Sequence, residues 1–181
     1  YSKDNLSDFW KNYLTDYYIF KCELGNLFDI LYIVLRNQKY TIRHPVQIKD
    51  IIINEIKNED NWKKVLANYI SSDILFKNVN SFNKFKEIIK SNTYIGNLND
   101  LYYISNYYKI NFIILNHNAD NLSNGFVCLG SKEYKNRPFV ILNLVLPNRF
   151  SLVVNNYKHF FINVEDLPNI FVKKYYNKCS N

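Results

Sequence analysis

Several residue types are scarce in this chain of 181 residues. Methionine is absent, and glycine and proline occur four times each, while asparagine, isoleucine, lysine and tyrosine are frequent. We interpret this bias as the codon usage of an AT-rich genome, such as that of a large DNA virus, a protist parasite or a mollicute. We interpret the missing initiator methionine as a sign that the sequence is part of a longer protein. Apolar runs are also short. None approaches the roughly 20 residues that cross a bilayer, so we expect no membrane span.

Cysteine is nearly as scarce. The three cysteines, Cys22, Cys128 and Cys179, are odd in number and follow no regular spacing. This pattern predicts neither a disulfide framework nor a zinc site, and we expect no metal and no cofactor. No signal peptide is visible at the N-terminus, so we expect a reducing, intracellular compartment such as the cytoplasm or nucleus.

Acidic residues are outnumbered by basic ones. The chain has 23 Lys and Arg against 16 Asp and Glu, which gives a net charge of +7 and a pI of about 9.1. Such a charge permits an acidic partner, including nucleic acid, to which tyrosine and phenylalanine rings could add base stacking. The lysines are scattered, however, arginine is rare, and no Arg/Gly-rich or RNP-like motif is present. A solvated basic surface is therefore the favoured interpretation, with nucleic-acid binding as an alternative.

The hydrophobic pattern predicts one α+β domain over residues 1–181. A hydrophobic content of 48% supports one core at this length. Apolar spacings of three and four predict helices, and short apolar or alternating runs predict strands. The predicted helices are 5–18, 27–35, 46–56, 62–70, 82–89 and 99–108; the predicted strands are 110–115, 126–129, 139–146, 150–154 and 159–164. The helix 27–35 is apolar on nearly every side, so we expect it at the centre, with a helical layer packed on a small mixed or antiparallel sheet.

Three segments stand out in order along the chain. Residues 23–28 read Glu-Leu-Gly-Asn-Leu-Phe at the entrance of the central helix. Residues 94–96 read Tyr-Ile-Gly and precede a predicted helix and strand, and residues 148–150 read Asn-Arg-Phe at the start of another strand. This ordered trio resembles the landmarks of the ovarian-tumour (OTU) cysteine deubiquitinase family. Those landmarks are an acidic-Gly-Asn-Cys-Leu-Phe turn with the nucleophile, a Trp/Tyr-x-Gly segment, and an Asn-His-Tyr-like strand start with the general base.

The resemblance implies a papain-related fold and a surface for ubiquitin or a ubiquitin-like protein. It also implies which residues line the site, and these are Glu23, Gly25, Asn26, Asn148, Arg149 and Phe150.

The chain departs from the family pattern at the catalytic positions. If Leu27 and Phe28 are aligned without a gap, Asn26 stands where the nucleophilic cysteine belongs; if Gly25 and Asn26 are aligned instead, the cysteine position is deleted. Either way, no thiol lies at the helix start, where the helix dipole and backbone N–H groups would stabilise a thiolate. Asparagine is nevertheless a good N-cap residue. Arg149 stands at the position of the histidine, and a guanidinium cannot act as a base.

Loss of both groups predicts a catalytically inactive OTU-like domain, a pseudo-deubiquitinase that acts as a protein-interaction or scaffolding module. The alternative is an active cysteine deubiquitinase with a relocated dyad of Cys22 and His159, which requires these two side chains to lie within hydrogen-bonding reach. The remaining histidines, His44 and His117, are predicted to be ordinary surface residues.

Overall fold

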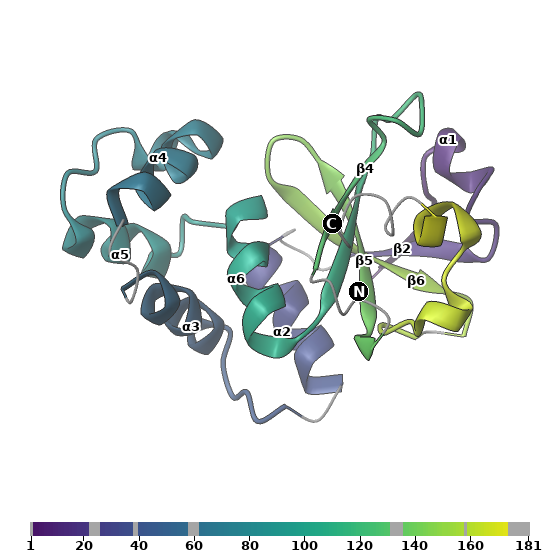
Figure 1. The fold of residues 1–181 in the computed structure, drawn as a ribbon, viewed down its shortest axis with the longest axis horizontal. Helices are drawn as coiled ribbons and strands as arrows, with labels where there is room; N and C mark the ends of the chain where they lie inside the picture. Colours follow the sequence, from purple (N-terminus) through teal and green to yellow (C-terminus); the bar gives the residue numbers. More distant parts are fainter. Residues whose placement is uncertain are drawn as a thin grey trace.

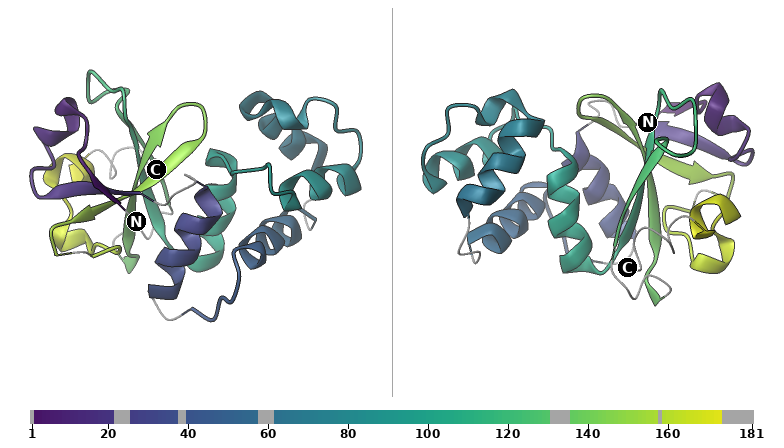
Figure 2. Two further views of the ribbon diagram at one scale, coloured as in Figure 1. Left: turned by 180° about the vertical axis from the view of Figure 1, so that it is seen from behind. Right: turned by 45° about the horizontal axis from the view of Figure 1, so that its top comes forward.

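The structure is a computed structural model that describes residues 2–21, 26–37, 40–57, 62–130, 136–157 and 159–173. A mixed β-sheet lies on one side of the molecule, and an arm of helices lies on the other, with α2 and α6 between them (Figure 1). Seen from behind, α2 runs beside α6, and the arm projects from that side (Figure 2). The arm comprises α3, α4 and α5.

The described residues form a six-stranded sheet in the order β1-β2-β6-β5-β3-β4. β3 and β5 are parallel, and the other neighbouring pairs are antiparallel. The central strands read as continuous apolar runs because both of their faces are covered. The strands are β1 (Ser2–Asp4), β2 (Tyr17–Lys21), β3 (Asn111–Asn116), β4 (Phe126–Leu129), β5 (Phe139–Val145) and β6 (Arg149–Asn155).

The helices lie on both faces of this sheet. They are α1 (Asp8–Lys11), α2 (Leu27–Asn37), α3 (Val46–Lys57), α4 (Trp62–Ser72), α5 (Phe82–Lys90) and α6 (Leu98–Tyr108), with the short 3-10 turns η1 (Ile74–Phe76) and η3 (Val164–Asp166). α2, α6 and the arm share a large apolar core with one face of the sheet, whereas α1 and the C-terminal segment cover the other face. None of the described helices is long and apolar enough to cross a bilayer.

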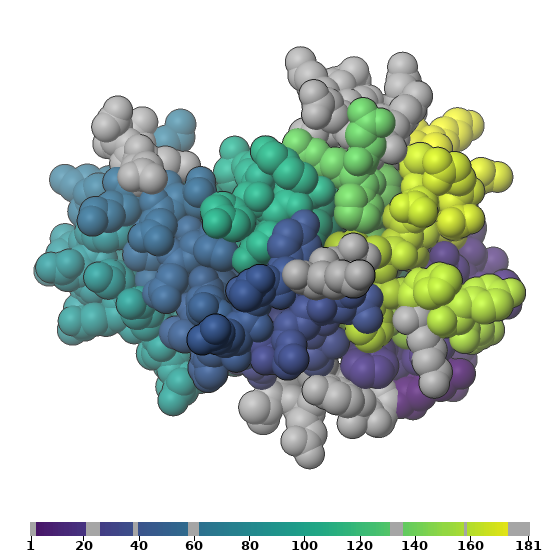
Figure 3. Space-filling view, turned by 90° about the horizontal axis from the view of Figure 1, so that it is seen from below, coloured from purple at the N-terminus to yellow at the C-terminus, as the bar shows by residue number. Residues whose placement is uncertain are grey.

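The central helix is buried as predicted. Six of the residues of α2 are buried, on the sides that face the sheet and α6. From below, α2 is visible between the arm and the C-terminal part of the chain (Figure 3). The arrangement confirms the predicted α+β class, with a helical layer on a mixed sheet.

Most of the predicted elements are confirmed with shifts of one or two residues, namely the helices from 27 to 108 and the strands β3 to β6. The predicted helix 5–18 is wrong. Only Asp8–Lys11 is helical, and Tyr17–Lys21 forms β2, which pairs with β1 and β6. The apolar residues Leu6, Trp10 and Leu14 are buried as the spacing requires, but against the sheet rather than along one continuous helix.

Three other expectations are corrected. The predicted strand 159–164 forms only an isolated bridge between Ile162 and Phe139 before the turn η3. Cys128 on β4 is disulfide-bonded, which the irregular cysteine spacing did not predict. His117 is half-buried rather than a simple surface residue, since its Nδ1 lies 3.3 Å from Nδ2 of the buried Asn143.

Candidate functional site

The site begins at the first turn of α2. The side-chain oxygen of Asn26 accepts the backbone N–H of Phe28 at 2.9 Å, and its carbonyl accepts the N–H of Ile30 at 3.2 Å. This is the geometry of an N-cap, so the predicted capping role of Asn26 is confirmed. The half-buried Asn26 thus supplies an amide at the point where backbone N–H groups and the helix dipole favour negative charge.

A second segment, residues 94–97, lies directly against this turn. The carbonyl of Ile95 accepts the N–H of Leu27 at 2.9 Å. Gly96 has a φ of +94°, and a Cβ atom added to it would lie 2.7 Å from Cβ of Leu27. Only glycine fits this close approach, because any side chain would meet α2 and would strain the backbone. The first two predicted segments therefore meet in space.

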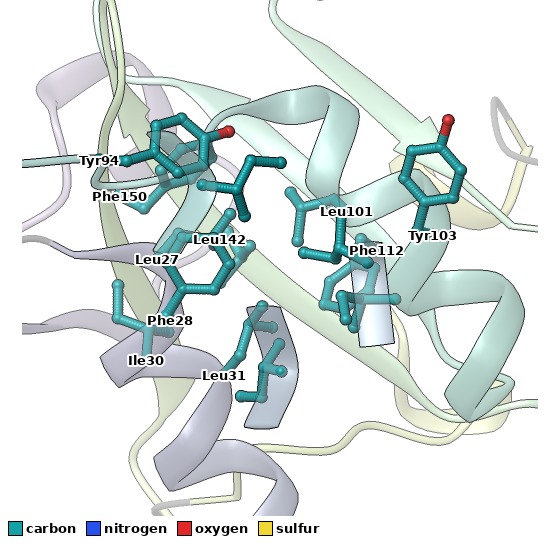
Figure 4. Close-up of a cluster of buried hydrophobic side chains, with 14 of the residues drawn as sticks. Leu27, Phe28, Ile30, Leu31, Tyr94, Leu101, Tyr103, Phe112, Leu142 and Phe150 are labelled. Carbon is teal, nitrogen blue, oxygen red and sulfur yellow. The ribbon is translucent and has the colours of Figure 1, made fainter. Parts of the chain in front are cut away.

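The third segment reaches the same place through Phe150. Side chains alternate between the faces of a strand. Phe150, Leu152 and Val154 of β6 belong to the core that contains α2, whereas Val153 belongs to the core on the other face. Figure 4 shows Phe150 together with Leu27, Phe28 and Tyr94 in one apolar cluster. The residue of β6 that faces the start of α2 is thus a phenyl ring.

Arg149 has a different location from the one that the family pattern suggests. It shares the face of Val153, away from α2, and is exposed, while Asn148 precedes it in the turn and is half-buried. Among the described residues, no hydrogen bond or ion pair joins Asn26 to Arg149. The side that faces the helix start therefore carries neither a histidine nor a guanidinium from this strand.

The other predicted site residues are not brought to this turn. Cys22, Glu23 and Gly25 lie outside the described residues. His159 is exposed, and its N–H donates to the side chain of Asn155. Asn155 ends β6, about 17 Å along the strand from Phe150. It lines a separate cavity of about 540 Å³, together with Tyr13, Asp16, Tyr17, Tyr157 and Asp166.

Sequence reasoning missed a buried polar cluster next to this turn. The carboxylate of Asp100, in the first turn of α6, is fully buried and accepts the hydroxyl protons of Tyr69 and Tyr94 and the N–H of Asn97. Burial raises the pKa of Asp100 from its usual 3.8 to about 6, although these hydrogen bonds and nearby Lys49 oppose the rise. The spacing Asn97-x-x-Asp100 is that of a capping box, which is the signal that could have identified it.

Lys49 of α3 completes the surroundings of this cluster. Its ammonium group donates to the carbonyl of Ser91 at 2.9 Å and lies 4.9 Å from the ring centre of Phe28. Burial lowers the pKa of Lys49, while the negative charges of Asp100 and Asp29 oppose that change. A buried cation therefore adjoins the first turn of α2 on the side of the arm.

A groove of about 630 Å³ opens between α4, α6 and β4. Its lining is largely apolar and includes Val65, Tyr69, Leu98, Tyr102, Val127 and Leu129. Tyr102 is 54% exposed and Val127 is 49% exposed, so large apolar groups face solvent here. No group of His, Cys, Asp and Glu side chains within the described ranges is arranged to hold a metal ion.

Comparison with known proteins finds similarity to solved structures and none at the level of sequence. No family model and no curated protein sequence matches the chain. An OTU deubiquitinase from Wolbachia pipientis wMel has a similar structure, with a TM-score of 0.54 and 13% identity over 82% of this chain and 94% of that one. An OTU domain solved in complex with ubiquitin matches with a TM-score of 0.52 and 9% identity over 88% of this chain and 89% of that one.

At such low identity the likeness concerns the fold. It agrees with the order of the three sequence segments and with the way in which the structure gathers them around the first turn of α2. The chain has an OTU-like fold.

Proposed function

We propose that this chain is a catalytically inactive OTU-like domain that binds a protein partner, with ubiquitin or a ubiquitin-like protein as the partner to test. The observation that carries the proposal is the first turn of α2, where Asn26 caps the helix and Phe150 faces it.

The chemistry of peptide hydrolysis supports this proposal. A cysteine protease needs a thiolate and a general base within hydrogen-bonding reach. The carboxamide of Asn26 is not a nucleophile, and the phenyl ring of Phe150 carries no exchangeable proton. The guanidinium of Arg149 stays protonated, and the alternation along β6 gives Arg149 the face of Val153, where it is exposed. Loss of triad members leaves only a small residual rate, so any hydrolysis at this turn would be slow.

Two features support a protein partner. One similar structure is an OTU domain bound to ubiquitin, and it covers most of this chain. The groove between α4, α6 and β4 exposes Tyr102 and Val127, and exposed aromatic and aliphatic groups beside a concave surface are typical of protein-binding sites. A surface of this kind does not require a nucleophile.

Binding is tested by titrating ¹⁵N-labelled ubiquitin with the protein and following its chemical shifts. We expect saturable shifts with the wild-type chain and at least tenfold weaker binding with Tyr102→Ala. Tyr157→Ala is the matched control, because Tyr157 is 79% exposed and lies at the separate cavity near His159. If Tyr102→Ala and Tyr157→Ala bind as tightly as the wild type, the groove is not the binding surface. If no shifts are seen at millimolar protein, ubiquitin is not the partner.

The absence of activity is tested with a ubiquitin probe that carries a thiol-reactive warhead. We expect no labelling of the wild-type chain beyond that of denatured protein. Labelling that disappears in both Cys22→Ala and His159→Ala would overturn the proposal and establish an active enzyme with a relocated dyad. Cleavage of di-ubiquitin by the wild type would have the same consequence.

A further inference from the structure

The polar cluster around Asp100 has no role in the proposed function. The carboxylate of Asp100 is nevertheless the most deeply buried charged group among the described residues. Its hydrogen-bond donors come from separate parts of the chain. Tyr69 belongs to α4 in the arm, whereas Tyr94 and Asn97 belong to the segment that precedes α6. We refer to Tyr69, Tyr94, Asn97 and Asp100 as the Asp100 junction.

On one side, the junction continues to the start of α2. Tyr94 is followed by Ile95 and Gly96, which contact Leu27 by a backbone hydrogen bond of 2.9 Å and by the close approach that excludes a side chain. The ring of Tyr94 also lies 5.8 Å from the ring of Phe28. A shift of this segment would therefore move the residues whose N–H groups form the first turn of α2.

On the other side, the junction continues into the arm and the groove. The Tyr69 ring packs against Phe76 of η1 and Phe85 of α5, and Tyr69 also lines the groove. Asn99, in the first turn of α6, donates to the carbonyl of Asn68 and to the hydroxyl of Ser72 in α4. These hydrogen bonds link α4 to the start of α6.

We propose that the Asp100 junction couples the groove side of the arm to the first turn of α2, so that a displacement of α4 is transmitted to Asn26 and Phe28. The physical reason is the cost of separating hydroxyl donors from a buried carboxylate, since an unpaired charge in this environment is far less stable than a fully hydrogen-bonded one. This coupling is a property of the fold and does not depend on which partner, if any, occupies the groove.

The charged groups around the junction are consistent with this role. Lys49 of α3 is the cation that faces Asp100, and it also donates to the carbonyls of Ser91 and Tyr94 at 2.9 and 3.5 Å. The negative charge of Asp29 in α2 interacts electrostatically with Lys49, and that of Asp73, which precedes η1, interacts with Tyr94. The junction is thus held from α3 as well as from α4.

The test is amide hydrogen exchange of the full chain, followed residue by residue and corrected for intrinsic rates. Tyr69→Phe removes the hydroxyl on the side of the arm and keeps the ring. We expect exchange at Leu27 and Phe28 to accelerate about tenfold, while Ile113 and Ile114 in the sheet change less than twofold. Tyr40→Phe is the matched control, because it removes a hydroxyl that bonds the Tyr108 carbonyl at the surface, and it should leave Leu27 unchanged.

Three results would overturn the proposal. One is unchanged exchange at Leu27 in Tyr69→Phe. The second is an equal acceleration at Leu27 and Ile113, which would mean global destabilisation only. The third is strict additivity of Tyr69→Phe and Tyr94→Phe at Leu27, since residues that act through one carboxylate must show a non-additive effect. Because ubiquitin is not used, failure here leaves the ubiquitin titration to be judged separately.

Discussion

Two residues from distant parts of the chain determine how α2 begins. Asn26 satisfies the N–H of Phe28, and Gly96 lets the preceding loop approach Leu27 closely enough for a backbone hydrogen bond. Asparagine at a helix start is recognisable from sequence because its capping chemistry is local. The need for glycine at position 96 is not local, since the atom that excludes a side chain belongs to a residue about 70 positions earlier.

Gly96→Ala is expected to lower the free energy of unfolding by about 2–4 kcal/mol. The new Cβ would lie 2.7 Å from Cβ of Leu27, and the φ of +94° is unfavourable for alanine, so strain and overpacking add. Urea unfolding followed by circular dichroism measures the change. A loss below 0.5 kcal/mol would show that the loop does not approach α2 as closely as the structure indicates.

Asp100→Asn is expected to change how stability depends on pH. The pKa of Asp100 is raised from 3.8 to about 6 by burial, so the folded chain holds this proton more tightly than the unfolded chain does. The contribution of the Asp100 carboxyl to stability therefore increases as the pH falls from 7 to 4, by roughly 2.5 kcal/mol, and is constant above about pH 7.

Denaturant unfolding at several pH values tests this expectation. The quantity to compare is the free energy of unfolding of the wild type minus that of Asp100→Asn, in which the contributions of other titrating groups cancel. This difference should rise as the pH falls from 7 to 4. A difference that stays flat or falls toward pH 4 would contradict the raised pKa.

At the scale of elements, β6 and α2 define the site through the faces that they present. The pleat of β6 directs Phe150, Leu152 and Val154 toward α2 and puts Arg149 on the other face. A shift of one residue in a strand exchanges its two faces. The family pattern, read along the sequence, places Arg149 at the base position, whereas the pairing of β6 with β2 and β5 makes Phe150 the neighbour of the helix start.

Restoring a catalytic pair tests this geometry. We expect Asn26→Cys combined with Phe150→His to react with the ubiquitin warhead probe at least tenfold faster than Asn26→Cys combined with Arg149→His. The reason is that a thiol at a helix N-terminus is activated by a histidine only within hydrogen-bonding reach. Asn26→Cys alone is the control for unassisted thiol reactivity.

Phe150→His also removes a buried ring, at a cost of about 3 kcal/mol, so folding of each variant is checked by near-UV circular dichroism. Faster labelling with the histidine at position 149 would show that Arg149, and not Phe150, is the residue next to the helix start.

At the scale of the whole molecule, the net charge of +7 and the apolar groove suggest different partners. The basic surface is compatible with nucleic acid, whereas the apolar groove between α4, α6 and β4 favours a protein. These partners differ in how their affinity depends on salt, because nucleic-acid binding releases condensed counterions.

We expect the ubiquitin binding proposed above to weaken less than about fivefold between 50 and 200 mM salt, since apolar contacts dominate the groove. A nucleic-acid site with six phosphate contacts would lose affinity by about 10³ over the same range. Fluorescence anisotropy with a labelled single-stranded oligonucleotide and with labelled ubiquitin, at both salt concentrations, distinguishes the two. Tight, steeply salt-dependent binding of the oligonucleotide alone would favour the nucleic-acid alternative.

The sequence by itself determined the helices from α2 to α6, the strands β3 to β6, and the capping of α2 by Asn26. These features depend on local periodicity and local hydrogen bonds, which are visible in a single chain. It also determined that no cysteine occupies the helix start, although the residues just before Asn26 lie outside the described part of the chain.

Only the tertiary structure decided that residues 17–21 form a strand and that Phe150 rather than Arg149 faces α2. It also decided that Asp100 joins the arm to the segment beside Leu27. Each of these depends on which distant segments pair or pack together. Non-local contacts override local spacing at such positions, because strand pairing and burial of a whole face stabilise more than a single turn of helix does.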